Sequence, residues 1–339
     1  MSKPVTISSP TSRISAFIVL AMLGMVALPA AITLSTVRRP AALTVPADPS
    51  PHGYTWSLLL FIVPIVVIAF WFVPREDLKI PQKAFRRTIG ILVPLGWGLD
   101  FFFAQRFFFF PDRGATLGIS APALGGPVPI EEYVFYLTGF IAILLIYVWM
   151  DEYWLAAYNV PDYPGEAKKI RRLLQFHPSS VVLGTVLIVM AIVYKEIFSA
   201  SPKGFPGYFV FLVAGAMVPA AGFFPTARPF INWRAFSATL FFILLISLLW
   251  EATLAVPYGW WNFQKKQMLG VFIGAWSGLP IEEVCVWIAV TYTTTIVFEI
   301  VKLWQASGRS FNRRFGECRR QATGTPRFRP GWDGRVWHA

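Results

Sequence analysis

The stretch VPIEEYVFYLTGFIAILLIYVWM, from Val128 to Met150, joins two adjacent acids to a long apolar run. Beyond Glu132 it contains no charged residue. An apolar run of about 20 residues has the length of a helix that crosses the hydrocarbon core of a bilayer. Proline and acids at its start are typical of a helix N-terminus, where the backbone dipole favours negative charge. The stretch therefore predicts a membrane-spanning helix that begins with two carboxylates.

Seven further apolar runs have a similar character. Of the 339 residues, 55% are apolar and 14% are charged, whereas soluble domains carry about 25% charged residues. The sequence predicts an all-α integral membrane protein with about eight transmembrane helices. Val181 to Tyr194 and Tyr208 to Phe224 are short or rich in Pro and Gly, so the expected count is eight give or take one. The seven further runs are Ile14 to Val37, Trp56 to Val73, Thr88 to Ala104, Val181 to Tyr194, Tyr208 to Phe224, Ala235 to Ala255 and Pro280 to Leu303.

The first of these runs has a second interpretation. Arg13, the apolar stretch and the small residues around Ala31 are similar to a cleavable signal peptide. The run continues past Ala31 as far as Val37, which favours an uncleaved helix.

Lysine and arginine are distributed unevenly over the predicted connections. The N-terminal segment, the even-numbered connections and the C-terminal tail carry 21 of them, and the odd-numbered connections carry 8. Because basic residues collect on the cytoplasmic side, we expect a multi-pass protein of the cell membrane with both termini in the cytoplasm. The net charge of +12 then reflects topology and attraction to anionic lipid headgroups. Membrane lipids, and not nucleic acid, are the expected charged partners.

Residue types that build metal centres and nucleotide sites are scattered along the chain. Cys285 and Cys318 lie far apart, and the three histidines fall in different connections. No CxxC, HExxH, GxGxxG or GxxxxGK[ST] spacing occurs. We therefore expect no metal centre and no cofactor, although carboxylates alone are able to hold a magnesium ion.

The opening motif occurs twice. VPIEEYVFY at Val128 to Tyr136 returns as LPIEEVCVW at Leu279 to Trp287, at an offset of 151 residues. Apolar runs upstream of the two copies align at the same offset. Since each unit has an even number of helices, the two units are expected to cross the membrane in the same sense. We predict two tandem parallel four-helix repeats, residues 1–151 and 152–305, followed by a basic, disordered C-terminal tail at 306–339.

Each repeat carries a further acid 31 residues before the first glutamate of its motif. Asp100 stands in WGLDFFFAQ and Glu251 in LLWEATLAV, near the ends of apolar spans. Ionisable groups inside a membrane are costly unless they pair or line a cavity, so they are functional candidates. Aromatic clusters follow both acids: Phe101, Phe102, Phe103 and Phe107 to Phe110 in the first repeat, and Tyr258, Trp260, Trp261 and Phe263 in the second.

Two simpler interpretations compete with a functional one. A single PIEE is typical of helix capping, and an aromatic run is typical of the ring belt at headgroup depth. Two copies of PIEE, each with an intramembrane acid and an aromatic-rich connection upstream, favour function over capping alone. Capping and chemistry can also coexist in one motif.

At these residues the sequence resembles the lycopene cyclases of the heterodimeric type found in bacteria, and their fused relatives in archaea and fungi. That family is built from small multi-helix membrane modules with a Pro-x-Glu-Glu or Pro-x-Glu-Asp signature, and an active enzyme needs two modules. PVPIEEYVFY and GLPIEEVCVW match this signature, and YGWWNFQKKQMLGVFIGAWSGLPIEE extends the match in the second repeat. The resemblance spans both repeats, from Val93 to Leu303. The first repeat departs from the pattern where FFFFPDRGATLG replaces the usual tryptophan-bearing connection.

The resemblance implies ring closure at the ends of lycopene or a related linear carotenoid, without a cofactor and without net redox change. Protonation of the terminal double bond gives a tertiary cation, a neighbouring double bond attacks it, and loss of a proton yields a β-, ε- or γ-ring. The reaction needs a neutral carboxylic acid in an apolar cavity, a base, and aromatic faces that stabilise the cation. A second copy of the chain and other enzymes of carotenoid synthesis are the protein partners to consider.

Within each motif the two glutamates point about 100° apart on a helix, so only one of them faces a given cavity. The family signature keeps the first acid more strictly, which favours Glu131 and Glu282 as the proton-handling carboxylates. Glu132 and Glu283 are expected to act as their partners or as helix caps.

The remaining expected site residues come from the same two repeats. Asp100 and Glu251 are expected to supply the second carboxylate of each unit. The sequence leaves open which glutamate acts as acid and which as base. The substrate is expected to contact the rings of Phe101, Phe102, Phe103, Phe135, Tyr136, Tyr258, Trp260, Trp261 and Trp287.

Two other functions remain open from the sequence. A proton-coupled transporter with parallel repeats would use the same acids as a proton relay. A related module acting on another isoprenoid end group is the second alternative. The crowding of aromatic residues around the acids favours an enzyme for an apolar polyene.

Overall fold

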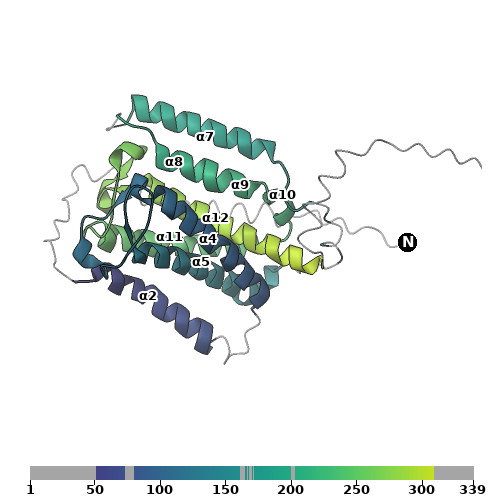
Figure 1. Cartoon of the computed structure of the whole chain (residues 1–339). Helices are drawn as coiled ribbons and strands as arrows, with labels where there is room; N and C mark the ends of the chain where they lie inside the picture. The colour runs from purple at the N-terminus through teal and green to yellow at the C-terminus, as the bar shows by residue number, and fades with distance from the viewer. Residues whose placement is uncertain are drawn as a thin grey trace, which may run out of the picture.

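The computed structural model describes residues 51–72, 80–160, 172–199 and 203–308, together with residues 165, 167 and 170. The first expected span, Ile14 to Val37, lies outside the described residues, and so does its signal-peptide alternative. The basic tail lies outside them from residue 309 onward. The described chain is mostly helical (Figure 1).

Six helices of the described chain are long and apolar enough to cross a membrane. Counted along the chain with the opening stretch as the fourth, they correspond to the second, third, fourth, fifth, seventh and eighth expected runs. The sixth run forms a shorter apolar segment, Gly207–Ala221. The chain thus has the helical, apolar architecture of a membrane protein. The six spans are Gly53–Phe70, Gln82–Phe107, Ile130–Trp154, Pro178–Ile197, Trp233–Ala255 and Ile281–Ala306.

Three of these spans end in a π-helical turn, in which the helix widens. Helices α2 (Gly53–Val67), α5 (Ile130–Trp149) and α11 (Trp233–Trp250) each continue into one, at Ile68–Phe72, Met150–Trp154 and Glu251–Ala255. Another, Leu212–Met217, joins α8 (Gly207–Phe211) to α9 (Val218–Ala221). Such turns are frequent at functional sites. The remaining helices are α4 (Gln82–Phe107), α7 (Pro178–Ile197), α10 (Phe224–Ala227) and α12 (Ile281–Ala306).

Helices α5 and α12 lie side by side and run in the same direction. Near their starts the ring centroids of Phe135 and Trp287 are 5.7 Å apart, and near their ends those of Tyr147 and Phe298 are 6.1 Å apart. This pairing forms the centre of the bundle, since α12 contacts α4, α5 and α11.

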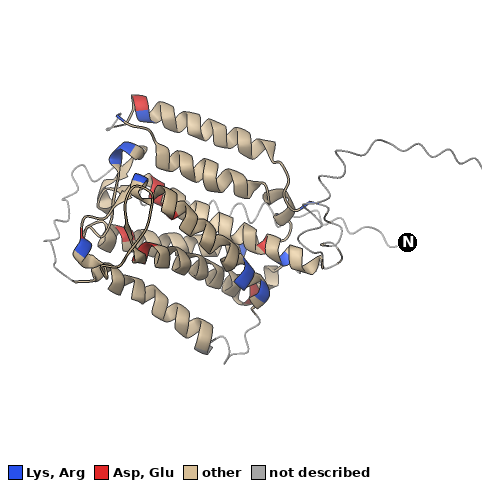
Figure 2. Ribbon diagram, in the orientation of Figure 1, with Lys and Arg blue, Asp and Glu red and all other residues tan. Residues whose placement is uncertain are grey.

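The outer helices face away from this centre. In α7 and α2 only 17% and 22% of the spanning residues are buried, against 56% in α11 and α12. In Figure 1, α7 and α2 lie at opposite edges of the bundle. Figure 2 shows that α2 carries no charged residue and that the charges of α7 lie at one of its ends. Both helices therefore expose the apolar surface that a lipid environment favours.

The connections before α5 and α12 meet at one end of the bundle. Strand β1 (Phe108–Phe109) pairs antiparallel with β4 (Asn262–Phe263), which joins the two connections directly. Within the first connection β2 (Ser120–Ala121) pairs with β3 (Val128–Pro129), and within the second β5 (Phe272–Ile273) pairs with β6 (Leu279–Pro280). Both PIEE motifs therefore start their helices from a two-residue hairpin strand. Short 3₁₀ turns complete the connections at Arg113–Ala115, Lys265–Gln267 and Gly274–Trp276, and another at Ala156–Tyr158 follows α5.

Candidate functional site

A pocket lies between the first three turns of α5 and α12. Both helices contribute residues at the same spacing of i, i+3, i+4 and i+7, which places them on one helical face. The pocket residues of α5 are Glu132, Phe135, Tyr136, Gly139 and Phe140, and those of α12 are Glu283, Val286, Trp287 and Val290.

Other elements complete the walls. Tyr54 of α2 and Tyr208 of α8 reach the pocket, as do Phe108 of β1, Glu251 of the π-helical turn after α11, and Trp261. The site is therefore built jointly from both halves of the chain. The sequence alone did not distinguish such a joint site from one site in each half.

Glu132 is held by a tyrosine. Its Oε1 accepts a hydrogen bond of 2.7 Å from the Tyr54 hydroxyl, and both side chains are buried. Tyr54 is anchored in turn by aromatic neighbours, since its ring stacks on Trp260 with centroids 6.1 Å apart. This arrangement fixes one carboxyl oxygen of Glu132.

Glu283 has a similar environment in the second half. Its carboxyl is close enough to the Tyr208 hydroxyl and to the Glu251 carboxyl to interact electrostatically with both, and all three side chains line the pocket. Oε1 of Glu251 accepts a hydrogen bond of 2.8 Å from Nε1 of Trp287. Two carboxyls and a phenol thus converge on the α12 side of the pocket.

Asp100 of α4 lies outside the pocket, near the α5 residues that line it. It is buried and close enough to Glu132 and Tyr136 to interact electrostatically with both. Within the described residues neither of its carboxyl oxygens has a hydrogen-bond donor. Asp100 precedes Glu132 in the sequence by the same number of residues as Glu251 precedes Glu283. Unlike Glu251, Asp100 does not line the pocket itself.

The first glutamate of each motif points elsewhere. Oε1 of Glu131 accepts hydrogen bonds from Thr55 Oγ1 at 2.6 Å and from the backbone N–H of Leu117 at 2.7 Å. Oε1 of Glu282 accepts from the backbone N–H of Leu269. Neither residue lines the pocket. In both units the first glutamate therefore ties the helix start to its own connection.

Aromatic rings surround the carboxyls. The Phe135 ring stacks on Trp250 at 5.6 Å and meets Trp287 edge-on at 5.7 Å. Trp261 lies 4.9 Å from Trp250 and 5.0 Å from Tyr54, measured between ring centroids. The pocket therefore offers several π-faces beside its acids.

The expected aromatic contacts divide into four groups. Phe135, Tyr136, Trp261 and Trp287 line the pocket. Trp260 and Tyr258 stack in sequence behind Tyr54, and Phe103 packs against Phe107 and Phe211. Phe101 and Phe102 are 38% and 54% exposed on the surface of α4 and do not line the pocket.

Some site residues were not expected from the sequence, chiefly Tyr54, Tyr208 and Gly139. The two tyrosines occupy similar places in the two halves but are separated by 154 residues, so the offset of the motifs does not align them. Gly139 stands one turn beyond Phe135 on the motif helix, and helical spacing alone would have found it.

The described residues that line the pocket include acids and lack a cationic side chain. No Lys, Arg or His is among the described residues that line it. Among the described residues no group of three His, Cys, Asp or Glu is arranged to hold a metal ion. A set of close carboxyls in an apolar pocket is suited to exchanging a proton with a bound apolar molecule, since a charge is poorly solvated there.

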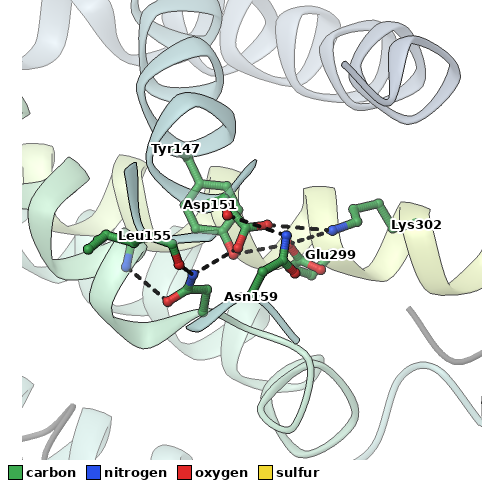
Figure 3. A network of polar contacts seen from close by, with 8 residues as sticks. Tyr147, Asp151, Leu155, Asn159, Glu299 and Lys302 are labelled. Carbon is green, nitrogen blue, oxygen red and sulfur yellow. Dashed lines mark hydrogen bonds and ion pairs between the residues drawn. The ribbon is translucent and has the colours of Figure 1, made fainter. Parts of the chain in front are cut away.

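A second polar cluster lies at the opposite ends of α5 and α12 (Figure 3). Nζ of Lys302 lies 3.9 Å from Asp151 and 3.4 Å from Glu299. The Tyr147 hydroxyl donates to Glu299 at 3.0 Å, and Nδ2 of Asn232 donates to Asp151 at 2.9 Å. We call these five residues the Lys302 network. Its acids are paired with a cation, unlike those of the pocket.

Comparison of the chain with family models, with curated proteins and with solved structures found no match. Function is therefore inferred from the residues of the pocket and from the sequence motifs.

Proposed function

We propose that this chain is a carotenoid cyclase, which closes rings at the ends of lycopene or a related linear carotenoid by acid–base chemistry. In this proposal the chain consists of two tandem four-helix units in a cell membrane, with both termini in the cytoplasm. The observation that carries the proposal is the joint pocket, in which carboxyls from both halves meet among aromatic rings, without a cation among the described lining residues.

The proposed reaction is an isomerisation. A carboxyl transfers its proton to the terminal double bond, which forms a C–H bond and leaves a tertiary carbocation. The π-electrons of a neighbouring double bond attack this cation and form the ring C–C bond. A carboxylate then removes a proton from the carbon next to the new cationic centre, and a ring double bond forms. Atoms and electrons balance without an oxidant or reductant.

The geometry favours the second glutamate of each motif for these transfers. Glu132 and Glu283 line the pocket, whereas Glu131 and Glu282 accept hydrogen bonds from the connections. We therefore assign the proton transfers to Glu132 and Glu283, in place of the first glutamates that the family signature favours.

The two glutamates are proposed to divide the work. Glu283 lies beside Glu251, and two neighbouring carboxyls share a proton more readily than they both carry charge. Glu132 likewise has a carboxyl nearby, that of Asp100, and a tyrosine hydroxyl, that of Tyr54. One of Glu132 and Glu283 is accordingly the proposed proton donor, and the other is the proposed proton acceptor.

The aromatic rings have a role in the same scheme. A cation over a desolvated aromatic face is stabilised by about 2 kcal/mol or more. Phe135, Trp261 and Trp287 line the pocket beside the acids. Apolar walls also keep water from capturing the carbocation, which would give an alcohol in place of a ring.

Production of the chain in cells that accumulate lycopene tests this function. Pigments are extracted and separated, and cyclic carotenoids are expected in cells with the wild-type chain. The matched control is a double variant, Glu132→Gln with Glu283→Gln, which retains the size of both side chains. Unchanged lycopene in cells whose membranes contain the wild-type chain would contradict the proposal.

A further inference from the structure

Gly139 lies in the middle of an apolar helix, at a position where the backbone conformation does not require glycine. It lies within α5 (Ile130–Trp149), where the backbone is regular. Its φ is not in the left-handed region, in contrast to the glycines of the connections such as Gly118 and Gly270. Glycine inside a helix is less favourable than alanine. Some other property must therefore account for it.

Close helix packing does not account for Gly139 either. A Cβ added to Gly96 of α4 would lie 3.0 Å from the Phe140 ring, and one added to Gly184 of α7 would lie 2.6 Å from Val218. A Cβ on Gly139 would meet only the edge of the Trp287 ring, at 4.0 Å, which is an ordinary contact. An alanine therefore fits at position 139 without any displacement.

What distinguishes Gly139 is its place in the pocket wall. Gly90 and Gly98 of α4 also have open space beside them, but neither lines the pocket. Gly139 follows Glu132 by two helical turns, a rise of about 10 Å along the axis. The pocket therefore extends from the carboxyls toward the apolar middle of α5, and Gly139 leaves room at that inner end.

The two halves of the chain differ at this place. The residue 151 positions after Gly139 is Val290, which lines the pocket from α12. Likewise Phe135 corresponds to Val286. The two halves have the same glutamates in their motifs, but they differ in the apolar residues that line the pocket. A long substrate therefore meets a pocket with room on one side, beside α5.

We propose that Gly139 is a specificity-determining residue, which leaves space for the chain of a linear polyene to run past α5 while its end group lies at the carboxyls. This inference rests on the proposed function and adds the path of the substrate to it. One end of the polyene occupies the pocket at a time, because the acids of both halves serve the same space.

The size of the residue at position 139 tests the inference. In membranes or nanodiscs with lycopene as substrate, Gly139→Leu is expected to raise KM at least tenfold, because its side chain fills the inner end of the pocket. Gly139→Ala is expected to raise KM about threefold and also to raise the melting temperature, since alanine is the better helix former. The matched control is Gly90→Leu, at an exposed position of α4 outside the pocket.

Different outcomes separate this inference from the proposed function. If the wild-type chain forms rings and Gly139→Leu has the KM and kcat of the wild type, the inference is wrong and the function stands. If the wild-type chain forms no rings, the function fails, and lycopene binding is measured by quenching of tryptophan fluorescence. Quenching that is weakened in Gly139→Leu and unchanged in Gly90→Leu would still support the polyene path, and equal quenching in all three proteins would overturn it.

Discussion

The pocket and the Lys302 network are two buried polar clusters at opposite ends of the same helix pair, α5 and α12. In the network, Lys302 lies within 3.4 Å and 3.9 Å of two acids, and tyrosine and asparagine side chains donate further hydrogen bonds. In the pocket, carboxyls from both halves converge without a lysine or arginine among the described lining residues. Both clusters bury charge-bearing side chains, and those of the pocket surround a space.

In the proposed function, this difference separates acids that stabilise the fold from acids that transfer protons. A buried acid paired with a cation holds two helices in register, and its removal leaves an uncompensated charge. A buried acid beside a cavity, without a cation, has a desolvation cost that only a function explains. The account therefore predicts that substitutions in the pocket lower activity without loss of stability, and that substitutions in the network do the reverse.

The largest effect is expected for Glu283→Gln. The amide has the size of the carboxyl but neither donates nor accepts the proton that the reaction transfers, so turnover should fall by 10² to 10⁴, the scale of positioned acid–base groups. Ring formation in isolated membranes measures this, and the melting temperature of the purified protein should stay close to that of the wild type. A Glu283→Gln variant that is inactive only because it is unfolded would place Glu283 among the acids that stabilise the fold.

A stability effect of similar importance is expected for Lys302→Met. The buried ion pairs to Asp151 and Glu299 would be lost, at a cost of about 3 to 5 kcal/mol. Thermal unfolding in detergent should show a much lower midpoint, while turnover per folded molecule stays near that of the wild type.

A double-mutant cycle provides the control for Lys302. If the pair with Asp151 causes the loss, Asp151→Asn combined with Lys302→Met should cost less than the sum of the two single variants. Strict additivity would show that the two residues act independently, and the network would then not be a unit.

A smaller effect is expected for Tyr54→Phe. This substitution removes the 2.7 Å hydrogen bond to Glu132 but keeps the ring that packs on Trp260 and Trp261. Hydrogen bonds to charged groups contribute about 1.5 to 3 kcal/mol, so turnover is expected to fall at least tenfold and less than in a Glu132→Gln variant. Full activity of Tyr54→Phe would mean that Glu132 needs no fixed orientation.

The apolar runs predicted the helical, apolar character of the described chain. Seven of the eight expected runs lie in the described chain, and each coincides with a helical segment. Composition and length suffice for this, because a long apolar run has few alternatives to a helix. The segment Gly207–Ala221 is shorter than the other six spans, as its Pro and Gly content suggested.

The details of the site were harder to obtain from the sequence. Motif and spacing located Asp100, Glu132, Glu251 and Glu283, the four acids in or beside the pocket. They did not distinguish Glu131 from Glu132, because adjacent residues on a helix differ only in the direction in which their side chains point. That direction depends on which face α5 turns toward α12. Tyr54 and Tyr208 reach the acids through tertiary packing from other helices, and no local pattern reports such contacts. Phe101 and Phe102 follow Asp100 in the sequence, yet they face outward on α4.

The direct test of the central claim compares the two glutamates within each motif. Glu131→Gln, Glu132→Gln, Glu282→Gln and Glu283→Gln are produced in the same lycopene-accumulating cells at matched membrane levels, and ring formation is measured. The account predicts a loss of 10² or more in Glu132→Gln and Glu283→Gln. Glu131→Gln and Glu282→Gln should stay within about tenfold of the wild type, since glutamine still accepts from the connections and the lost charge–dipole interaction is only about 0.3 to 1 kcal/mol. The reverse order, with activity lost in the first glutamates and kept in the second, would contradict it.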